Sequence, residues 1–77
     1  MGIKAYILIT AETGKAREVL AALKQRSAVR RANLCVGRPD IICFVEASHD
    51  RALGSLILRE IQALPGVQET ATHIVIE

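Results

Sequence analysis

The spacing of apolar residues changes along this chain in an order that few folds accommodate. Apolar side chains crowd or alternate in four segments of strand length: Ile3 to Thr10, Val29 to Val36, Ile41 to Ala47 and Thr70 to Ile76. Two segments between them repeat their apolar residues at helical spacing instead. The sequence therefore predicts the order strand, helix, strand, strand, helix, strand.

Each predicted helix has one apolar stripe. The first helix runs from Lys15 to about Arg26, and the second is capped by Ser48 or Asp50 and stops at Pro65-Gly66. The stripes consist of Ala16, Val19, Leu20 and Leu23 in the first helix, and of Leu53, Leu56, Ile57, Ile61 and Leu64 in the second. Thr13 is a plausible N-cap of the first helix, because its hydroxyl can accept from an unpaired backbone N–H.

The segment Gly37-Arg38-Pro39-Asp40 predicts a hairpin between the second and third strands, because Gly, Pro and Asp suit tight turns. Two right-handed strand-helix-strand crossovers joined by this hairpin give a four-stranded antiparallel sheet with both helices on one face. This is the ferredoxin-like α+β fold. A chain of 77 residues has room for one core, so we expect a single domain over residues 1–77.

The predicted strands are apolar on both faces, although the two helices shield only one face of a sheet. In the first strand Tyr6 and Leu8 oppose Ile3, Ala5, Ile7 and Ile9, and in the third Ile42 and Phe44 oppose Ile41, Cys43 and Val45. One of these sets is left as an exposed apolar patch. We therefore expect a homodimer that packs sheet on sheet, as in dimeric α/β-barrel assemblies.

Charge and cysteine content argue against several classes of ligand. The net charge of +2 at pH 7 is too small to favour a nucleic-acid partner. The local basic stretch of Lys24, Arg26, Arg30 and Arg31 fits a solvated helix end. Cys35 and Cys43 lack metal-ligand spacing, so we expect reduced, buried thiols and neither a metal nor another cofactor.

No segment has the features of a secretory signal, and the longest apolar runs have only the length of strands. The sequence therefore predicts a soluble, cytoplasmic protein.

No set of residues has the spacing of a catalytic triad, so the sequence favours a protein that is not an enzyme. We expect His73 to be packed and His49 to be exposed near a helix start. The alternative is a cofactor-free dimeric α/β-barrel oxygenase or isomerase that uses Tyr6 and His73. RNA recognition is disfavoured because Phe44 stands alone among aliphatic residues.

Two parts of the sequence resemble one family. They are the turn Gly37-Arg38-Pro39-Asp40 followed by Ile41-Ile42, and the segment from Leu64-Pro65-Gly66-Val67 through Thr70 to Ile76. The opening Lys4 to Ile9 and the helix start at Gly14-Lys15 are similar as well. Together they resemble the effector-sensing RAM domain (regulation of amino-acid metabolism) of the Lrp/AsnC, or feast/famine, transcription regulators.

The resemblance implies dimers built sheet to sheet, rings of such dimers, and a small effector, usually an amino acid, bound in clefts between dimers. Family regulators carry an N-terminal helix-turn-helix domain, whereas this chain starts at the first sensor strand. We therefore expect a stand-alone amino-acid sensing module that does not bind DNA by itself and could join a full-length regulator.

By position, the resemblance places the effector-binding residues at the hairpin turn and on the last strand: Gly37, Arg38, Pro39, Asp40, Thr70 and Thr72. Asp40 could accept from an ammonium group, and backbone N–H groups near Gly37 could bind a carboxylate. Turn geometry and strand propensity explain the same residue types without a ligand. Proline at position 39 and valine at position 36 depart from the common family pattern, which has an aromatic residue and a threonine there.

Overall fold

The computed structural model describes residues 2–77, and its elements follow the predicted order. The strands are β1 (Ile3–Ala11), β2 (Val29–Leu34), β3 (Ile41–Ala47) and β4 (Val67–Ile74). The helices are α1 (Ala16–Lys24) and α2 (Asp50–Ser55), and α2 continues into a π-helical segment, η1 (Leu56–Ile61). The four strands form one antiparallel sheet in the order β2-β3-β1-β4. The ferredoxin-like fold is thus confirmed.

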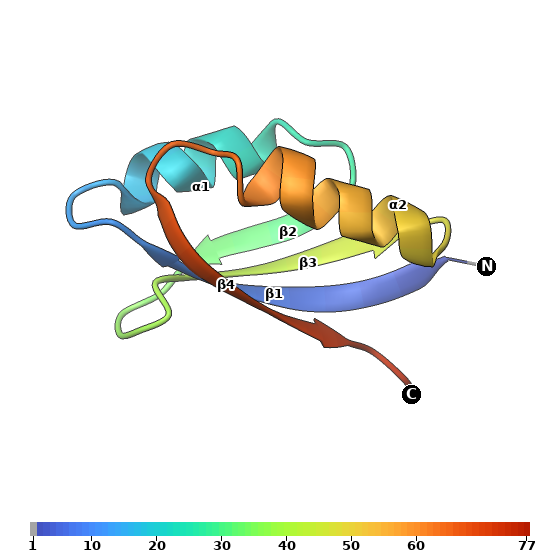
Figure 1. Cartoon of the computed structure of the whole chain (residues 1–77). Coiled ribbons are helices and arrows are strands. Elements are labelled where there is room, and N and C mark those ends of the chain that lie inside the picture. Colours follow the sequence, from blue (N-terminus) through green and yellow to red (C-terminus); the bar gives the residue numbers. More distant parts are fainter. Residues whose placement is uncertain (1) are drawn as a thin grey trace.

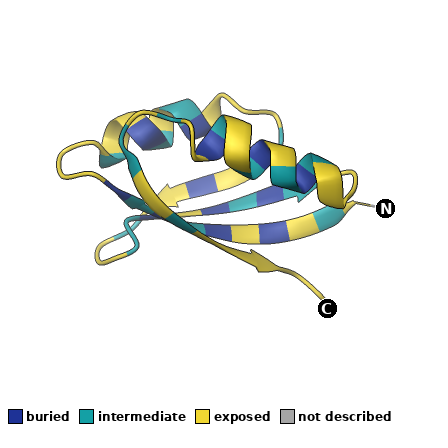
Figure 2. Ribbon diagram, viewed as in Figure 1, coloured by how far each residue is buried: buried dark blue, intermediate teal, exposed yellow. Residues whose placement is uncertain are grey.

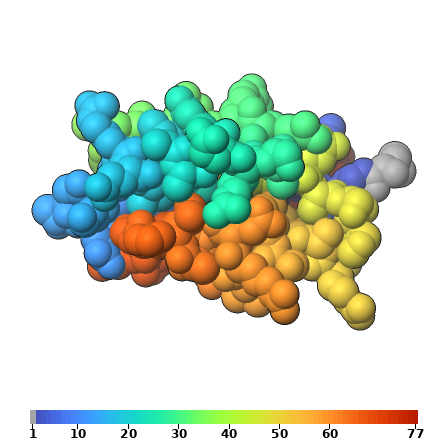
Figure 3. Space-filling view, turned by 90° about the horizontal axis from the view of Figure 1, so that it is seen from above, coloured from blue at the N-terminus to red at the C-terminus, as the bar shows by residue number. Residues whose placement is uncertain are grey.

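All helical segments lie on one face of the sheet (Figure 1). Seen from that side, α1 lies next to the rod formed by α2 and η1 (Figure 3). The predicted apolar stripes face the sheet, where Val19, Leu23, Leu53, Leu56 and Ile61 are buried (Figure 2). They pack against the sheet residues Ala5, Ile7, Ile9, Ala32, Ile41, Cys43 and Val45. The core is therefore aliphatic and lies between the helices and one sheet face.

Both predicted helix caps differ from the observed ones. Thr13 does not cap α1: it lies in the turn before Lys15, which occupies the N-cap position without a side-chain hydrogen bond. The chain reaches α1 through Gly14 at φ +80° instead. At α2 the cap is neither Ser48 nor Asp50 but His49, whose Nδ1 accepts from the N–H of Ala52 at 3.2 Å.

The second helix ends earlier than the proline suggests, since η1 stops at Ile61. The N–H of Gln62 donates to the carbonyl of Ile57 at 2.7 Å, a spacing of five residues that widens the last turn. The chain then turns through Gly66, which has φ +94° and would place a Cβ 2.8 Å from the Cβ of Lys15. Glycine at this position is required by both conformation and space.

The bounds of three strands also shift. β1 extends to Ala11, β2 ends at Leu34 rather than Val36, and β4 begins at Val67 and ends at Ile74. Val36 is fully exposed beyond the end of β2. The early start of β4 reflects the pairing of Ala11 with Val67 past a bulge at Thr10 and Ala11.

No element of the described chain covers the second face of the sheet (Figure 1). We call this surface the open face; its apolar centre consists of Tyr6, Leu8, Ile42 and Phe44. Tyr6 is 41% exposed and Ile42 is 37% exposed. Of the two apolar sets in the sequence, this is the one left uncovered in a single chain.

Candidate functional site

The hairpin between β2 and β3 is closed by a backbone hydrogen bond of 2.6 Å, from the N–H of Cys35 to the carbonyl of Asp40. Gly37 takes φ +119°, a conformation that residues with a side chain rarely adopt. Gly37 and Arg38 are exposed, whereas Pro39 and Asp40 are half-buried against the end of β1. The predicted turn is therefore present, with Asp40 at its base.

Asp40 joins this hairpin to β1. Its N–H donates to the carbonyl of Ile9 at 2.9 Å, and its Oδ2 accepts from the N–H of Ala11 at 2.8 Å. The second carboxylate oxygen, Oδ1, makes no hydrogen bond within residues 2–77. One oxygen of Asp40 thus holds the bulged end of β1, and the other remains able to accept from a ligand.

The two threonines lie on β4, on the other side of β1 from the hairpin. Thr70 pairs with Ile9 and Thr72 with Ile7, so both side chains lie on the helix-covered face. The Oγ1 of Thr70 already accepts from Nε2 of Gln62 at 2.9 Å, and Thr72 is exposed. Asp40 and Thr70 therefore flank Ile9 from its two sides, about two strand spacings or ~10 Å apart.

A shallow depression of about 220 Å³ lies where the hairpin approaches β4. It is lined by Leu8, Thr10, Pro39, Glu69, Thr70 and Ala71. Glu69 pairs with Thr10 and adds a carboxylate that the sequence reasoning missed. Only the register between β1 and β4 places Glu69 beside the hairpin. In the sequence, the one indication that Glu69 could belong to the site is its position next to Thr70. Within one chain, the six predicted residues do not enclose a ligand.

The open face carries a row of larger side chains across all four strands. Arg31 pairs with Phe44, Phe44 with Tyr6, and Tyr6 with His73. The rings of Tyr6 and Phe44 are 5.0 Å apart, and the guanidinium of Arg31 lies 5.2 Å from the Phe44 centroid. His73 is exposed here rather than packed, because β4 is an edge strand and this face is uncovered in one chain.

The enzyme alternative requires a substantial cavity beside Tyr6 or His73. Tyr6 lines a depression of only about 110 Å³, which His73 does not line. No carboxylate lines that depression. The geometry of the described chain therefore gives this alternative no support.

The thiols do not lie together in a reactive site. Cys43 is buried on the covered face, and burial raises its pKa from 9.0 to about 11, against a smaller lowering by the backbone at Ile7. Cys35 is half-buried in the hairpin, a little more open than predicted, and both thiols are free. Within residues 2–77, no three His, Cys, Asp or Glu side chains gather as metal ligands, and no helix has the length and apolarity to cross a membrane.

The fold of the chain is similar to that of several solved structures. The crystal structure of FFRP-DM1 superposes with a TM-score of 0.92 at 34% identity, over 96% of this chain and 99% of that chain. AsnC of E. coli gives a TM-score of 0.92 at 25% identity, over 97% of this chain and 51% of AsnC.

A transcriptional regulator from Neisseria meningitidis in complex with L-Met gives a TM-score of 0.88 at 19% identity, over 97% of this chain and 50% of that chain. At that identity, the likeness shows the fold alone. The chain thus spans nearly all of FFRP-DM1 and about half of each of the two regulators.

A search among curated proteins gives no match. The family model of the Lrp/AsnC ligand binding domain, however, matches residues 4–77, which is almost the whole chain. Together with the βαββαβ topology and the hairpin based on Asp40, this match identifies the chain as a member of the Lrp/AsnC ligand-binding domain family.

Proposed function

We propose that this chain senses a small effector, an amino acid, as a homodimer whose copies associate further to complete the binding cleft. The observation that carries the proposal is the family match over residues 4–77. In the proposed role, the domain acts with a transcription regulator of the same family, and the chain itself is not a catalyst. The predicted cytoplasmic location and the extent of the domain over residues 1–77 remain predictions.

The open face supports the dimer. A chain of this length buries only about 60% of its unfolded surface, so further apolar burial contributes a large share of its stability. Tyr6, Leu8, Ile42 and Phe44 form a contiguous apolar surface on the uncovered face of the sheet. A second copy of the same face provides an apolar surface of matching shape, and we propose packing of sheet on sheet around a twofold axis.

The hairpin end of the sheet supports the position of the effector. Asp40 has a free Oδ1, Pro39 and Thr70 line the depression next to it, and Glu69 adds a second carboxylate. An amino acid needs an acceptor for its ammonium and donors for its carboxylate. In this proposal Asp40 accepts from the ammonium, N–H groups near Gly37 meet the carboxylate, and the exposed Arg38 contributes from the rim. Thr72, whose side chain points to the helix-covered face, contributes only to an effector that reaches that face.

The depression is open to solvent, and the six predicted effector-binding residues lie on both sides of β1, in the hairpin and on β4. A second dimer that approaches the hairpin end would close it, which is why the proposal places the cleft between dimers. The N. meningitidis regulator was obtained with L-Met, so L-methionine belongs in the first group of effectors to be tested.

Calorimetry with the common amino acids tests the sensor. We expect at least one amino acid to bind and to raise the Tm of the protein. Asp40→Asn should weaken the binding of that amino acid by about 2 to 3 kcal/mol, roughly a hundredfold. The asparagine variant keeps an acceptor for the Ala11 N–H. Asp40→Ala is less suitable, because it also removes the hydrogen bond to the Ala11 N–H, and that loss costs about 1 to 3 kcal/mol of stability. If Asp40 only bound the ligand, its removal would change folding much less.

The matched control is Asp50→Asn, which removes the same charge at an exposed position in the first turn of α2. Thr72→Val removes one hydroxyl and should cost about 0.5 to 1.5 kcal/mol of affinity if that hydroxyl meets the ligand. The sensor proposal would be contradicted if no amino acid at millimolar concentration gave heat of binding or thermal stabilisation. Equal binding by Asp40→Asn and wild type would place the effector elsewhere.

A further inference from the structure

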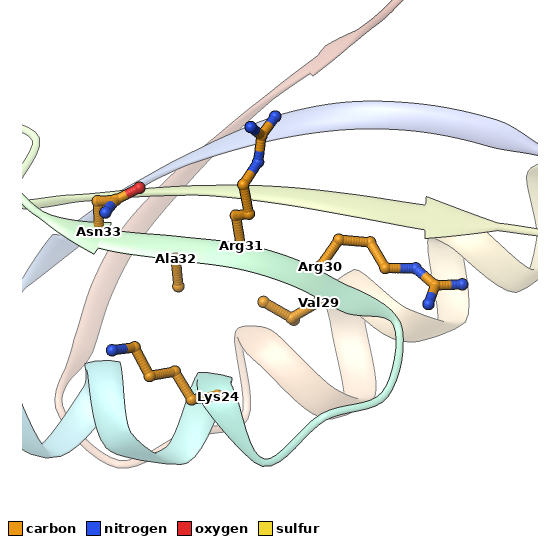
Figure 4. Close-up of a pocket in the computed structure, with 6 residues that line it drawn as sticks. All are labelled: Lys24, Val29, Arg30, Arg31, Ala32 and Asn33. Carbon is orange, nitrogen blue, oxygen red and sulfur yellow. The ribbon is translucent and has the colours of Figure 1, made fainter.

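A basic groove runs along the outer edge of the sheet, away from the hairpin depression. One of its residues, Arg31, also packs against Phe44 of the open face. The groove has a volume of about 330 Å³ and lies between the end of α1 and β2 (Figure 4). Its lining consists of Lys24, Val29, Arg30, Arg31, Ala32 and Asn33. Three of these six residues are cationic and none is acidic, so the groove favours an anionic occupant.

The positive charge of the groove is only partly neutralised by the protein. Arg30 Nε lies 3.9 Å from Oε1 of Glu46, and both side chains are well exposed, so this pair is weak. Lys24 makes no ion pair with any residue of the described chain. Arg31 is held against the Phe44 ring, which orients its guanidinium without reducing its charge.

The cationic groups do not converge on one point. Figure 4 shows Arg31 rising from one face of β2, Arg30 extending away from it along the strand, and Lys24 approaching from α1 below the opposite face. A compact anion such as phosphate would contact only one or two of them. An extended chain with several negative charges would contact all three.

β2 also offers a backbone to such a chain. It is an edge strand, so the N–H and C=O groups on its outer side are not paired with the sheet. An extended peptide can add to such an edge by main-chain hydrogen bonds, and its side chains then project alternately to the two faces. The cations of the groove also lie on both faces of β2, where they would meet acidic side chains of an added strand.

We propose that the β2 edge docks an extended acidic segment of a partner protein by strand addition. Nucleic acid fits less well, because single strands bind through bases stacked on aromatic rings and the nearby Phe44 is occupied by Arg31. In a sheet-to-sheet dimer Lys24, Val29 and Ala32 stay accessible, since they lie on the helix side of β2. Arg31, which packs against Phe44 on the open face, would lie at the margin of the dimer contact. Docking at this edge is independent of effector binding at the hairpin.

A fluorescein-labelled peptide of about eight alternating Glu and Val residues, a little longer than a usual strand, is the probe. Fluorescence anisotropy should show salt-sensitive binding, and the corresponding Lys-Val peptide should not bind. Lys24→Glu combined with Arg30→Glu should weaken binding by at least about tenfold. Both side chains are exposed, and an unchanged circular dichroism spectrum verifies the fold of the variant.

The matched control is Arg51→Glu combined with Arg59→Glu, which makes the same charge change at exposed positions of α2 and η1 and should alter binding less than about twofold. A peptide N-methylated at alternate residues tests strand addition, because it keeps the carboxylates but loses backbone donors. Equal binding of that peptide would overturn the proposal, and so would tighter binding of an RNA oligonucleotide of equal charge. If the acidic peptide does not bind the wild type and the double variant aggregates, the cations serve only to protect the β2 edge from pairing with other chains.

Discussion

The two faces of the sheet are both apolar, yet only one of them is buried by the helices. On the covered face Ile7, Ile9 and Ile41 have no exposed surface, because α1, α2 and η1 pack over them. On the open face their immediate neighbours in sequence, Leu8 and Ile42, remain partly exposed. The same strands thus contribute a buried core on one side of the sheet and a partly exposed apolar surface on the other.

This difference separates two roles of apolar surface. Burial on the covered face stabilises the single chain, at about 25 cal/mol for each Å² removed from water. The open face contributes little to the single chain and, in the proposed dimer, stabilises association by the same effect. Substitutions on the two faces should therefore affect different equilibria: those on the covered face change folding, and those on the open face change association.

The largest effect is expected from a buried leucine under the covered face. Leu23→Ala should lower the free energy of unfolding by about 2 to 5 kcal/mol, because Leu23 is fully buried and the vacated volume cannot fill. Urea denaturation measures the change. A loss below about 1 kcal/mol would mean that α1 does not pack on the sheet as described.

The next effect concerns the open face. Ile42→Glu should weaken dimerisation by about 2 to 4 kcal/mol, since a carboxylate would be buried between the sheets. Sedimentation at micromolar concentration measures the association. Val36→Glu is the control, because Val36 is fully exposed on the hairpin and lies outside the sheet. A wild type that sediments as a monomer, or an Ile42→Glu variant that dimerises normally, would contradict the separation of the faces.

A smaller loss should follow at the margins of the covered face. Leu20 and Ile57 belong to the predicted stripes, but both are half-buried and pack at the periphery of the core. Leu20→Ala or Ile57→Ala should therefore cost about 1 to 2 kcal/mol, less than Leu23→Ala. Equal losses at all three positions in urea denaturation would indicate that a partner or a shifted helix covers the margins too.

The sequence was sufficient for the fold because its strongest signals are periodic. The stripes through Val19 and Leu23 and through Leu53 and Ile61 are buried as predicted. Element ends were less predictable, since they depend on distant contacts. Ala11 belongs to β1 because it pairs with Val67 of β4 past a bulge. The side chain that caps α2 belongs to His49, which a preference for Ser or Asp does not anticipate.

The candidate site was harder to predict for the same reason. The turn Gly37 to Asp40 could be predicted from residue types, but the anchoring of Asp40 to Ala11 could not. Glu69 faces Thr10 only because of the register in which β4 pairs with β1. The side chain of Thr70 points to the covered face and is bonded by Gln62, a contact across the turn after η1. Pairwise register, and not residue type, determines which groups meet at the hairpin end.

The last prediction uses Cys43, which points to the covered face between the open-face residues Ile42 and Phe44. Burial raises the pKa of Cys43 from its ordinary value of 9.0 to about 11. As pH rises through this window, the thiol of the unfolded chain loses its proton while that of the folded chain keeps it. The folded state therefore becomes progressively less stable relative to the unfolded state.

The measurement is the free energy of unfolding of wild type relative to Cys43→Ala, taken from pH 9.0 to about 11. The wild type should lose stability relative to the variant across this range, because only the wild type carries the thiol. All other ionisable groups are present in both proteins and cancel in the difference. Cys35→Ala should behave as the wild type does. If Cys43→Ala and wild type show the same pH dependence, water reaches Cys43, and the contrast between the covered and open faces is weaker than their burial implies.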